Sequence, residues 1–518
     1  MTQKTPSIFK KSSDLALLTI ISRILGLVRE SVTAAFLGTG GLADAFAVAF
    51  MIPNVMRRLF AEGVISAAFI PQFKGLVTEN RRERAAEFLN AVFSVLTVLA
   101  FIFVVIFILC SGNLVSLLAP SLEAESAAEA AFLAKIMFPY IFFITLAALT
   151  QSVLNSSGIF KPSGCSPIVF NIIFITAAFL LSRFTANPAR ALAIGVLSGG
   201  CMQLLIQIPF LRKTLFRFRF VSLKKAFSDP ALKKSGKLVL ATLLGTGAYQ
   251  LNILLTTNFA NKAGVGVVSS LQFSARIEEL ILGVFVVTLS TVILPELVGN
   301  AKRGESEELE KNLVSALRFV AFVSIPAVVF TVFNSAEIVK LLFGFGKFGE
   351  TSVSLTSDAL KFRIFGLFFI AVSRIMMSFF YAFEKTAVPI FAGLTSIIVN
   401  IVAAYFLVGT LSGGGIALAT AIASFSCAAV LFTAFKICFK DMAKLWRIFL
   451  HFFKISVISA LSILPVIFLK VHVYSFFETV SLPRKICEIC SFSAIALVFT
   501  VLFFVFSLLF KVQVFRNK

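Results

Sequence analysis

The sequence predicts an all-α polytopic membrane protein of about 14 transmembrane helices. Hydrophobic residues make up 58% of its 518 residues and charged residues only 14%, and the mean hydropathy is +0.98. Apolar runs of about 18 residues or more recur along the chain, and a helix of that length crosses a hydrocarbon core about 30 Å thick. These runs do not alternate between apolar and polar residues, which argues against the strands of a β-barrel.

Each predicted helix is centred on one of these apolar runs. Polar or charged residues separate successive runs, and most of the connecting segments are short. The helices are expected near residues 13–37, 44–70, 86–112, 127–153, 164–184, 190–212, 238–260, 269–296, 313–334, 353–382, 387–409, 414–436, 448–470 and 485–511.

The positive charge is unevenly distributed along the chain. The net charge is +22 at pH 7, which by itself could indicate a nucleic-acid partner. If both termini are cytoplasmic, however, most Lys and Arg side chains fall on the inner side, and the loop Arg212–Lys237 alone holds nine of them. This is the positive-inside pattern, and such loops contact anionic lipids. We therefore expect membrane lipids, and no nucleic acid, as partners of the basic loops.

Two pairs of similar segments indicate an internal duplication. Segment 71–96 aligns without gaps on 295–320, and the helix around Asn171 corresponds to the helix around Asn400. Six helices in each half would give the halves the same orientation, as in transporters whose substrate site lies between parallel repeats. We expect two parallel six-helix repeats around a central cationic cavity, followed by two extra helices. The predicted domains are 1–212, a basic cytoplasmic linker at 213–237, 238–440, and 441–518 as a groove for a lipid tail.

Several arginines lie inside predicted helices, notably Arg23, Arg29, Arg57 and Arg276. A charge at the bilayer centre costs at least about 2.5–3.5 kcal/mol, so these four would together cost about 10 kcal/mol if they faced lipid. We therefore expect them to line a water-filled cavity.

Helical spacing gives the predicted helix 13–37 a polar sector. One stripe along the helix holds Ser22, Gly26 and Arg29. The neighbouring stripe holds Arg23 and Glu30. Gly26 has no side chain, which permits the close approach of another helix or of a ligand. In the next predicted helix, Pro53 is expected to kink the backbone beside Asn54 and Arg57.

Some of these charges have acidic residues nearby that could serve as structural partners. The open pairings are Arg58 with Glu62, Arg276 with Glu279, and Arg29 with Glu30 or Asp44. Arg23 has no acidic residue three or four positions away. The role of Arg374, near the inner end of the predicted helix 353–382, stays open.

Basic residues outnumber acidic partners in this predicted cavity, which indicates an anionic ligand. A guanidinium group is permanently charged, and its planar fork matches phosphate oxygens bidentately. A pyrophosphate is therefore the favoured ligand, with small anions as an alternative, and the two extra helices suggest that it carries a long apolar tail.

Metal, redox and nucleotide sites are not indicated. The two histidines lie far from any partner at metal-ligand spacing, and Cys487 and Cys490 have redox spacing without a thioredoxin-like pattern around them. No GxxxxGK[ST] motif occurs. We expect a transporter rather than an enzyme, without a cofactor, driven by the membrane potential or an ion gradient.

Several motifs resemble one family of lipid transporters. The runs SRILGLVRE (22–30) and ADAFAVAFMIPNVMRRLFAEGVISAAFIP (43–71) are similar to the start of the MurJ/MviN lipid II flippases, in the multidrug/oligosaccharidyl-lipid/polysaccharide exporter superfamily. The similarity continues through FPYIFF (138–143), SPIVFN (166–171), SARIEE (274–279) and LPEL (294–297). It implies a protein of the bacterial cytoplasmic membrane that moves the undecaprenyl-pyrophosphate-linked peptidoglycan precursor to the outer leaflet by alternating access. Because one chain contains the whole expected pathway, we expect the protein to act as a monomer.

The resemblance also implies roles for individual residues. Arg23, Arg29, Arg57 and Arg276 match the essential cavity arginines of the family, and its other polar positions are matched by Ser22, Glu30, Asp44 and Ser269. Ala275 stands where an acidic residue is often found. Asn400 matches a sodium-site position of some members, but Ala404 lacks the carboxylate expected one turn later, which argues against sodium coupling.

Other functions would account for part of this pattern. A flippase for another undecaprenyl-linked glycan would bind the same pyrophosphate. A multidrug exporter of the same superfamily usually needs an acidic cavity, and an anion channel would not need two large repeated halves.

Overall fold

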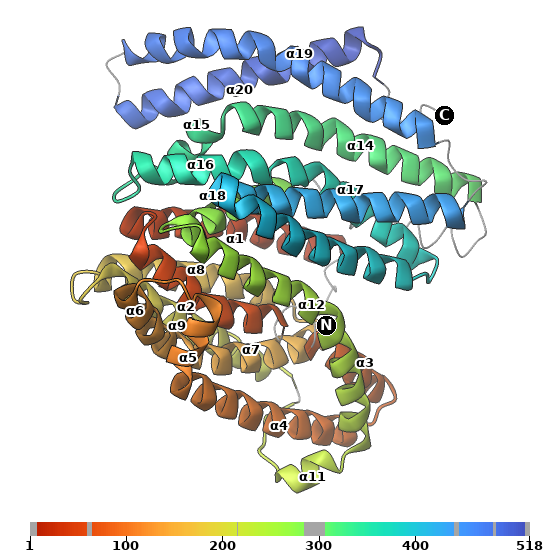
Figure 1. Cartoon of the computed structure of the whole chain (residues 1–518). Helices are drawn as coiled ribbons and strands as arrows, with labels where there is room; N and C mark the ends of the chain where they lie inside the picture. Colours follow the sequence, from red (N-terminus) through yellow and green to blue (C-terminus); the bar gives the residue numbers. More distant parts are fainter. Residues whose placement is uncertain are drawn as a thin grey trace. The chain divides into compact units, whose positions relative to one another are not determined.

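The computed structural model describes residues 8–59, 65–214, 216–283, 306–439, 445–479 and 483–512. Every element in these ranges is a helix (Figure 1). Nine helices among the described residues are long and apolar enough to cross a membrane. The predicted all-helical, multi-span fold class is therefore confirmed, whereas the count of about 14 spans stays a prediction.

The chain forms two compact units, Met1–Ser269 with Phe345–Phe348 and Ser270–Gly344 with Gly349–Lys518. The first unit contains α1 (Ile8–Leu37), α2 (Gly41–Leu59), α3 (Ile65–Thr78), α4 (Arg82–Leu109), α5 (Ser111–Leu118), α6 (Ala124–Met137), α7 (Pro139–Ser156), α8 (Lys161–Leu181), α9 (Pro188–Leu205), α10 (Ile208–Leu211), α11 (Leu223–Phe227) and α12 (Pro230–Lys262).

Proline and capping residues set several helix starts in the first unit. Proline occupies the first turn of α7, α9 and α12, where its missing N–H costs no hydrogen bond. The Asn187 side chain accepts a hydrogen bond from the backbone of α9, and Asp229 does the same for α12. The predicted helix 127–153 is divided into α6 and α7, with Pro139 beginning α7.

The second unit contains α14 (Ser306–Phe333), α15 (Ser335–Phe343), α16 (Glu350–Arg363), α17 (Phe365–Ala382), α18 (Ala387–Cys438), α19 (Leu445–Glu478) and α20 (Arg484–Leu509). A further helix at 267–283 begins in the first unit and continues into the second. Within the second unit, α17 packs on α18, α14 packs on α19, and α19 lies beside α20 (Figure 1).

Two predicted helices of the second unit follow each other directly. The predicted helices 387–409 and 414–436 both form, and together they make up the 52 residues of α18. Ser412 interrupts it with non-helical dihedral angles, φ 48° and ψ −127°. The chain therefore changes direction between two helical segments without a separate loop.

Candidate functional site

The polar sector of α1 packs against α8. The Asn171 side-chain amide of α8 donates a hydrogen bond to the Ser22 carbonyl oxygen at 3.3 Å. A Cβ atom at Gly26 would lie 3.8 Å from the same amide nitrogen, which is ordinary contact distance. Gly26 was expected to allow the close approach of a helix or of a ligand, and the helix beside it in the structure is α8.

Arg29 is held by charge and by aromatic rings. Its guanidinium contacts the Glu30 carboxylate, and each of the two side chains is only 16% exposed. The rings of Phe170 and Phe174 on α8 lie with their centroids 5.6 and 5.7 Å from the guanidinium carbon, within cation–π range. Of the two acidic partners that the sequence allowed, Glu30 is therefore the one that Arg29 contacts.

Arg23, two turns before Glu30 on α1, has a different environment. Its side chain is half-buried. Within the described part of the chain it makes no hydrogen bond and no ion pair. Because a partly buried guanidinium loses hydration without gaining a partner here, it is the side chain of this face that is most available to an anion.

Arg57 is oriented by a neighbour on its own helix. The Asn54 side-chain oxygen accepts hydrogen bonds from Arg57 Nε at 3.3 Å and from Nη2 at 3.2 Å. The helix α2 continues through Pro53 to this point. Arg58 is half-buried, and Glu62, its expected partner, lies outside the described residues.

Asp44 and Ser269, far apart in sequence, lie together in the first unit. Asp44 is 1% exposed, and its carboxylate oxygens accept hydrogen bonds from the backbone amides of Gly266 at 2.6 Å and Ser269 at 2.8 Å. These amides belong to the first turn of the helix 267–283, whose positive end stabilises a carboxylate. Asp44 therefore caps the helix on which Arg276 lies two turns later.

In the second unit, Arg276 pairs with Glu279. Arg276 Nη1 lies 2.8 Å from Glu279 Oε2, and the two side chains are 28% and 50% exposed. The i, i+3 spacing allowed this pair, and the contact leaves the guanidinium accessible.

A second, more buried ion pair beside it was missed in the sequence. Arg363 Nη1 lies 3.5 Å from Glu278 Oε2, with side chains 12% and 7% exposed. Glu278 stands inside the SARIEE segment, but 85 residues separate it from Arg363, and no local spacing connects them. Only the fold brings these two residues together.

The remaining predicted positions also lie in the second unit. Arg374 is exposed on α17 and lies near enough to Glu278 for an electrostatic attraction between the two side chains. Asn400 is buried on α18, and Ala404, one turn later, is fully buried. Among the described residues, no group of three His, Cys, Asp or Glu side chains could hold a metal ion.

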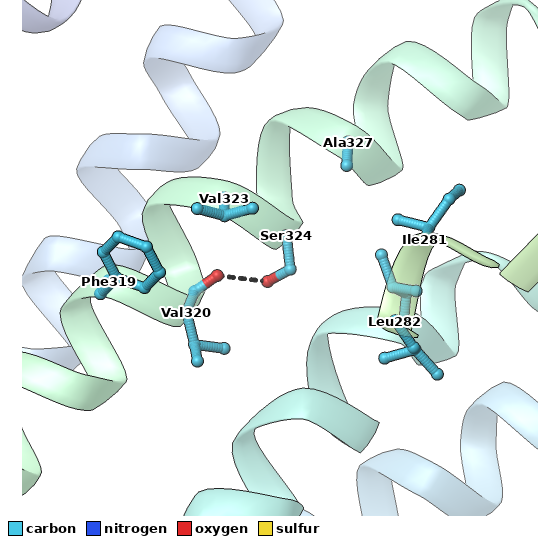
Figure 2. Close-up of a pocket in the computed structure, with 8 residues that line it drawn as sticks. Ile281, Leu282, Phe319, Val320, Val323, Ser324 and Ala327 are labelled. Carbon is cyan, nitrogen blue, oxygen red and sulfur yellow. Dashed lines mark hydrogen bonds between the residues drawn. The ribbon is translucent and has the colours of Figure 1, made fainter. Parts of the chain in front are cut away.

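A small apolar gap between α14 and the helix 267–283 can be dismissed as a binding site. Its volume is only about 10 Å³, about the space of one water molecule. Figure 2 shows its apolar lining and the Ser324 hydroxyl, which donates a hydrogen bond to the Val320 carbonyl of its own helix at 2.6 Å. The gap is a packing defect of the core rather than a ligand pocket.

Comparison with known proteins identifies the family. The family described as lipid II flippase MurJ matches residues 33–488. The chain is 39% identical over 424 residues to a probable lipid II flippase MurJ from Treponema pallidum, covering 81% of this chain and 80% of the relative.

Solved structures share the fold. A lipid II flippase MurJ in an inward closed conformation superposes with a TM-score of 0.76 at 24% identity, over 95% of this chain and 98% of the other. An inward-facing multidrug resistance transporter of the MATE family, in the MOP superfamily, gives a TM-score of 0.69 at 15% identity, over 80% and 94%. From the family match and the sequence identity, the chain belongs to the lipid II flippase MurJ family of multi-pass bacterial inner-membrane transporters.

Proposed function

We propose that this protein flips lipid II, the undecaprenyl-pyrophosphate-linked peptidoglycan precursor, from the inner to the outer leaflet of the cytoplasmic membrane by alternating access. Family membership over most of the chain supports this function. The single structural observation that supports an anionic substrate is Arg23, which is half-buried on α1 without a partner among the described residues.

The arginines of the proposed substrate site differ in how their side chains are held. Arg23 supplies charge that none of the described residues neutralises, so we expect it to bind the pyrophosphate first. Arg29 and Arg57 are pre-oriented by Glu30 and Asn54, which lowers the entropy lost when they bind. Preorganised guanidinium groups bind phosphate bidentately, which a flexible ammonium does not.

The acidic and hydroxyl residues hold other parts of the proposed site in place. Asp44 fixes the first turn of the helix that carries Arg276, and Ser269 stands in that turn. Glu279 holds the Arg276 guanidinium at 2.8 Å while leaving it accessible. We assign Arg58, Glu62 and Arg374 secondary roles in substrate binding, and Ser22 contributes its backbone carbonyl to the α1–α8 contact.

The driving force is the membrane potential. The cell interior is negative, so outward movement of an anion is downhill by about 2.3 kcal/mol per charge per 100 mV. Ala404 offers no carboxylate beside Asn400, so sodium is not assigned a role. The protein acts as a monomer with both termini in the cytoplasm, catalyses no covalent step, and keeps the lipid tail along α19 and α20.

The deciding experiment is depletion of the protein in its host, followed by analysis of lipid-linked intermediates. Accumulation of lipid II, with its head group protected from an externally added probe, is the expected result. Accumulation of a different undecaprenyl-linked glycan would replace lipid II as the substrate while keeping the pyrophosphate site. Unchanged lipid intermediates together with increased drug sensitivity would point to multidrug export and contradict the proposal.

A further inference from the structure

A second site lies at one end of the helix pair α19 and α20. In the second unit, a cavity of about 320 Å³ lies between α15, α16, α19 and α20, within the range of about 300–1,000 Å³ of small-molecule sites. Its lining includes the last turns of α19 and the first turns of α20, both of which are candidate spans. The cavity is therefore at the level of a membrane interface.

Both signs of charge line this cavity. The Lys340 ammonium lies 3.6 Å from Glu350 and 3.8 Å from Glu488. These distances exceed the roughly 2.7–2.9 Å of a charge-assisted hydrogen bond. Lys340 is thus attracted by two carboxylates but hydrogen-bonded to neither, and it can take a further anionic partner. Arg484, at the rim, is 83% exposed, and its Nε atom lies 3.7 Å from the Glu488 carboxylate, also beyond the distance of a charge-assisted hydrogen bond.

A buried hydroxyl in the wall has no partner. Ser491 is 1% exposed and lines the cavity, and its Oγ atom makes no hydrogen bond with any described residue. On the neighbouring α19, Ser459 and Ser462 both donate to the carbonyl one turn earlier, at 2.8 Å each. A buried hydroxyl that makes no such bond keeps its desolvation cost until a ligand or water satisfies it.

The chemistry of the surroundings selects an amphiphile. Glu350 at the rim is 83% exposed and can receive an ammonium group, while Lys340, Arg484 and Ser491 can receive a phosphate. Exposed apolar side chains flank the cavity on the same helix ends, such as Ile489 at 49% and Phe476 at 64%. A soluble zwitterion would leave these side chains unused, whereas acyl chains would cover them.

We propose that this cavity binds the head group of a zwitterionic phospholipid of the phosphoethanolamine type. The phosphate lies between Lys340, Arg484 and the Ser491 hydroxyl, and the ammonium group lies at Glu350. The acyl chains cover the exposed apolar side chains at this end of α19 and α20, such as Phe476 and Ile489. This site is independent of the pyrophosphate-binding arginines and does not require that the protein flip lipid II.

The test measures lipid binding to the purified full-length protein in detergent by native mass spectrometry. Dioleoylphosphatidylethanolamine is compared with dioleoylphosphatidylglycerol, which lacks the ammonium group, and with soluble O-phosphoethanolamine, which lacks the tails. Tighter binding of the ethanolamine lipid is expected. Equal binding of both lipids, or equally tight binding of O-phosphoethanolamine, would overturn the proposal.

Variants locate the site. Lys340→Met and Ser491→Ala should each weaken binding of the ethanolamine lipid by about tenfold, the effect of losing one hydrogen bond to a charged group. The matched controls Lys361→Met and Ser462→Ala remove the same groups from α16 and α19 at residues that do not line the cavity, and should bind as the wild type does. Unchanged binding in both cavity variants would contradict the assignment.

Discussion

At the scale of single residues, the arginines predicted from the sequence differ in how far the protein already satisfies them. Arg29 contacts Glu30, Arg57 donates two hydrogen bonds to Asn54, and Arg276 pairs with Glu279. Arg23 has no such partner among the described residues. An arginine that is already paired gains less from a bound phosphate, so the contributions to substrate binding should be unequal.

Removing the Arg23 charge should therefore reduce transport most. We expect Arg23→Ala to lower the rate of lipid II translocation in proteoliposomes by about 10–100-fold, since a hydrogen bond to a charged group contributes about 1.5–3 kcal/mol. Arg183→Ala, at an exposed position after α8, is the control and should transport normally. Full translocation by Arg23→Ala at normal membrane levels would remove Arg23 from the site.

Replacing Asp44 should lower the stability of the protein, whether or not it also affects substrate binding. Asp44→Ala leaves the buried amides of Gly266 and Ser269 without acceptors, so the free energy of unfolding should fall by about 2 kcal/mol. Asp44→Asn keeps one acceptor oxygen and should cost less. Thermal unfolding in detergent measures both. Asp358→Ala, which removes a carboxylate that is 56% exposed and paired with Lys361, should change stability little.

At the scale of the elements, two glycines of α9 determine where the aromatic residues of α8 lie. A Cβ atom at Gly195 would approach the Phe174 backbone to 3.3 Å, and one at Gly199 would approach the Phe170 ring to 2.8 Å. These are small residues one turn apart, an arrangement that lets two helix backbones approach closely. Phe170 and Phe174 in turn flank Arg29, so this packing reaches the proposed site.

Adding a methyl group to α9 at this contact should disturb both helix packing and transport. We expect Gly199→Ala to lower the free energy of unfolding by about 1–3 kcal/mol, the usual cost of overpacking, and to slow lipid II translocation by displacing Phe170. Gly112→Ala in α5 is the matched control, because a Cβ atom added there would have no other group within 4 Å. That substitution should preserve stability or raise it by up to about 1 kcal/mol. Equal behaviour of the two variants would show that the α8–α9 contact adapts without cost.

The elements were largely predictable from the sequence, and their interruptions were not. Length and apolarity determine where a membrane helix can form, so most predicted ranges overlap an observed helix. The 387–436 region was predicted as two helices, and the structure has two helical segments there that meet at Ser412. The predicted helix 127–153, in contrast, is divided into α6 and α7. A break of this kind involves so few residues that it leaves no signal in an average over many residues.

Site residues were predictable where the signal is local. The cost of a charge in a membrane singled out Arg23, Arg29, Arg57 and Arg276, and helical spacing suggested the Arg276–Glu279 pair. The Arg363–Glu278 pair and the cap that Asp44 provides join segments 85 and more than 200 residues apart. Contacts of this kind depend on tertiary packing, which periodicity does not encode.

At the scale of the whole molecule, positive charge is unevenly distributed along the sequence. The chain carries +22 overall, with the basic loops assigned to the cytoplasm and a smaller set of arginines assigned to the substrate path. By the positive-inside rule, we expect these loops to orient the protein in the membrane and to stay in place during transport. If the site arginines also stay in place while the substrate moves, the transported charge is that of the substrate alone.

Transport should then respond to the sign of the membrane potential. In proteoliposomes loaded with fluorescent lipid II, a potassium diffusion potential set with valinomycin should speed translocation away from the negative side, because each charge gains about 2.3 kcal/mol per 100 mV. Reversing the gradient should slow it, and equal potassium on both sides with valinomycin present is the control. A rate that ignores both size and sign of the potential would mean that positive charge on the protein travels with the pyrophosphate. Of the four arginines Arg23, Arg29, Arg57 and Arg276, Arg23 is the one without a partner among the described residues, so repeating the measurement with Arg23→Gln would then tell whether its charge is the one that moves.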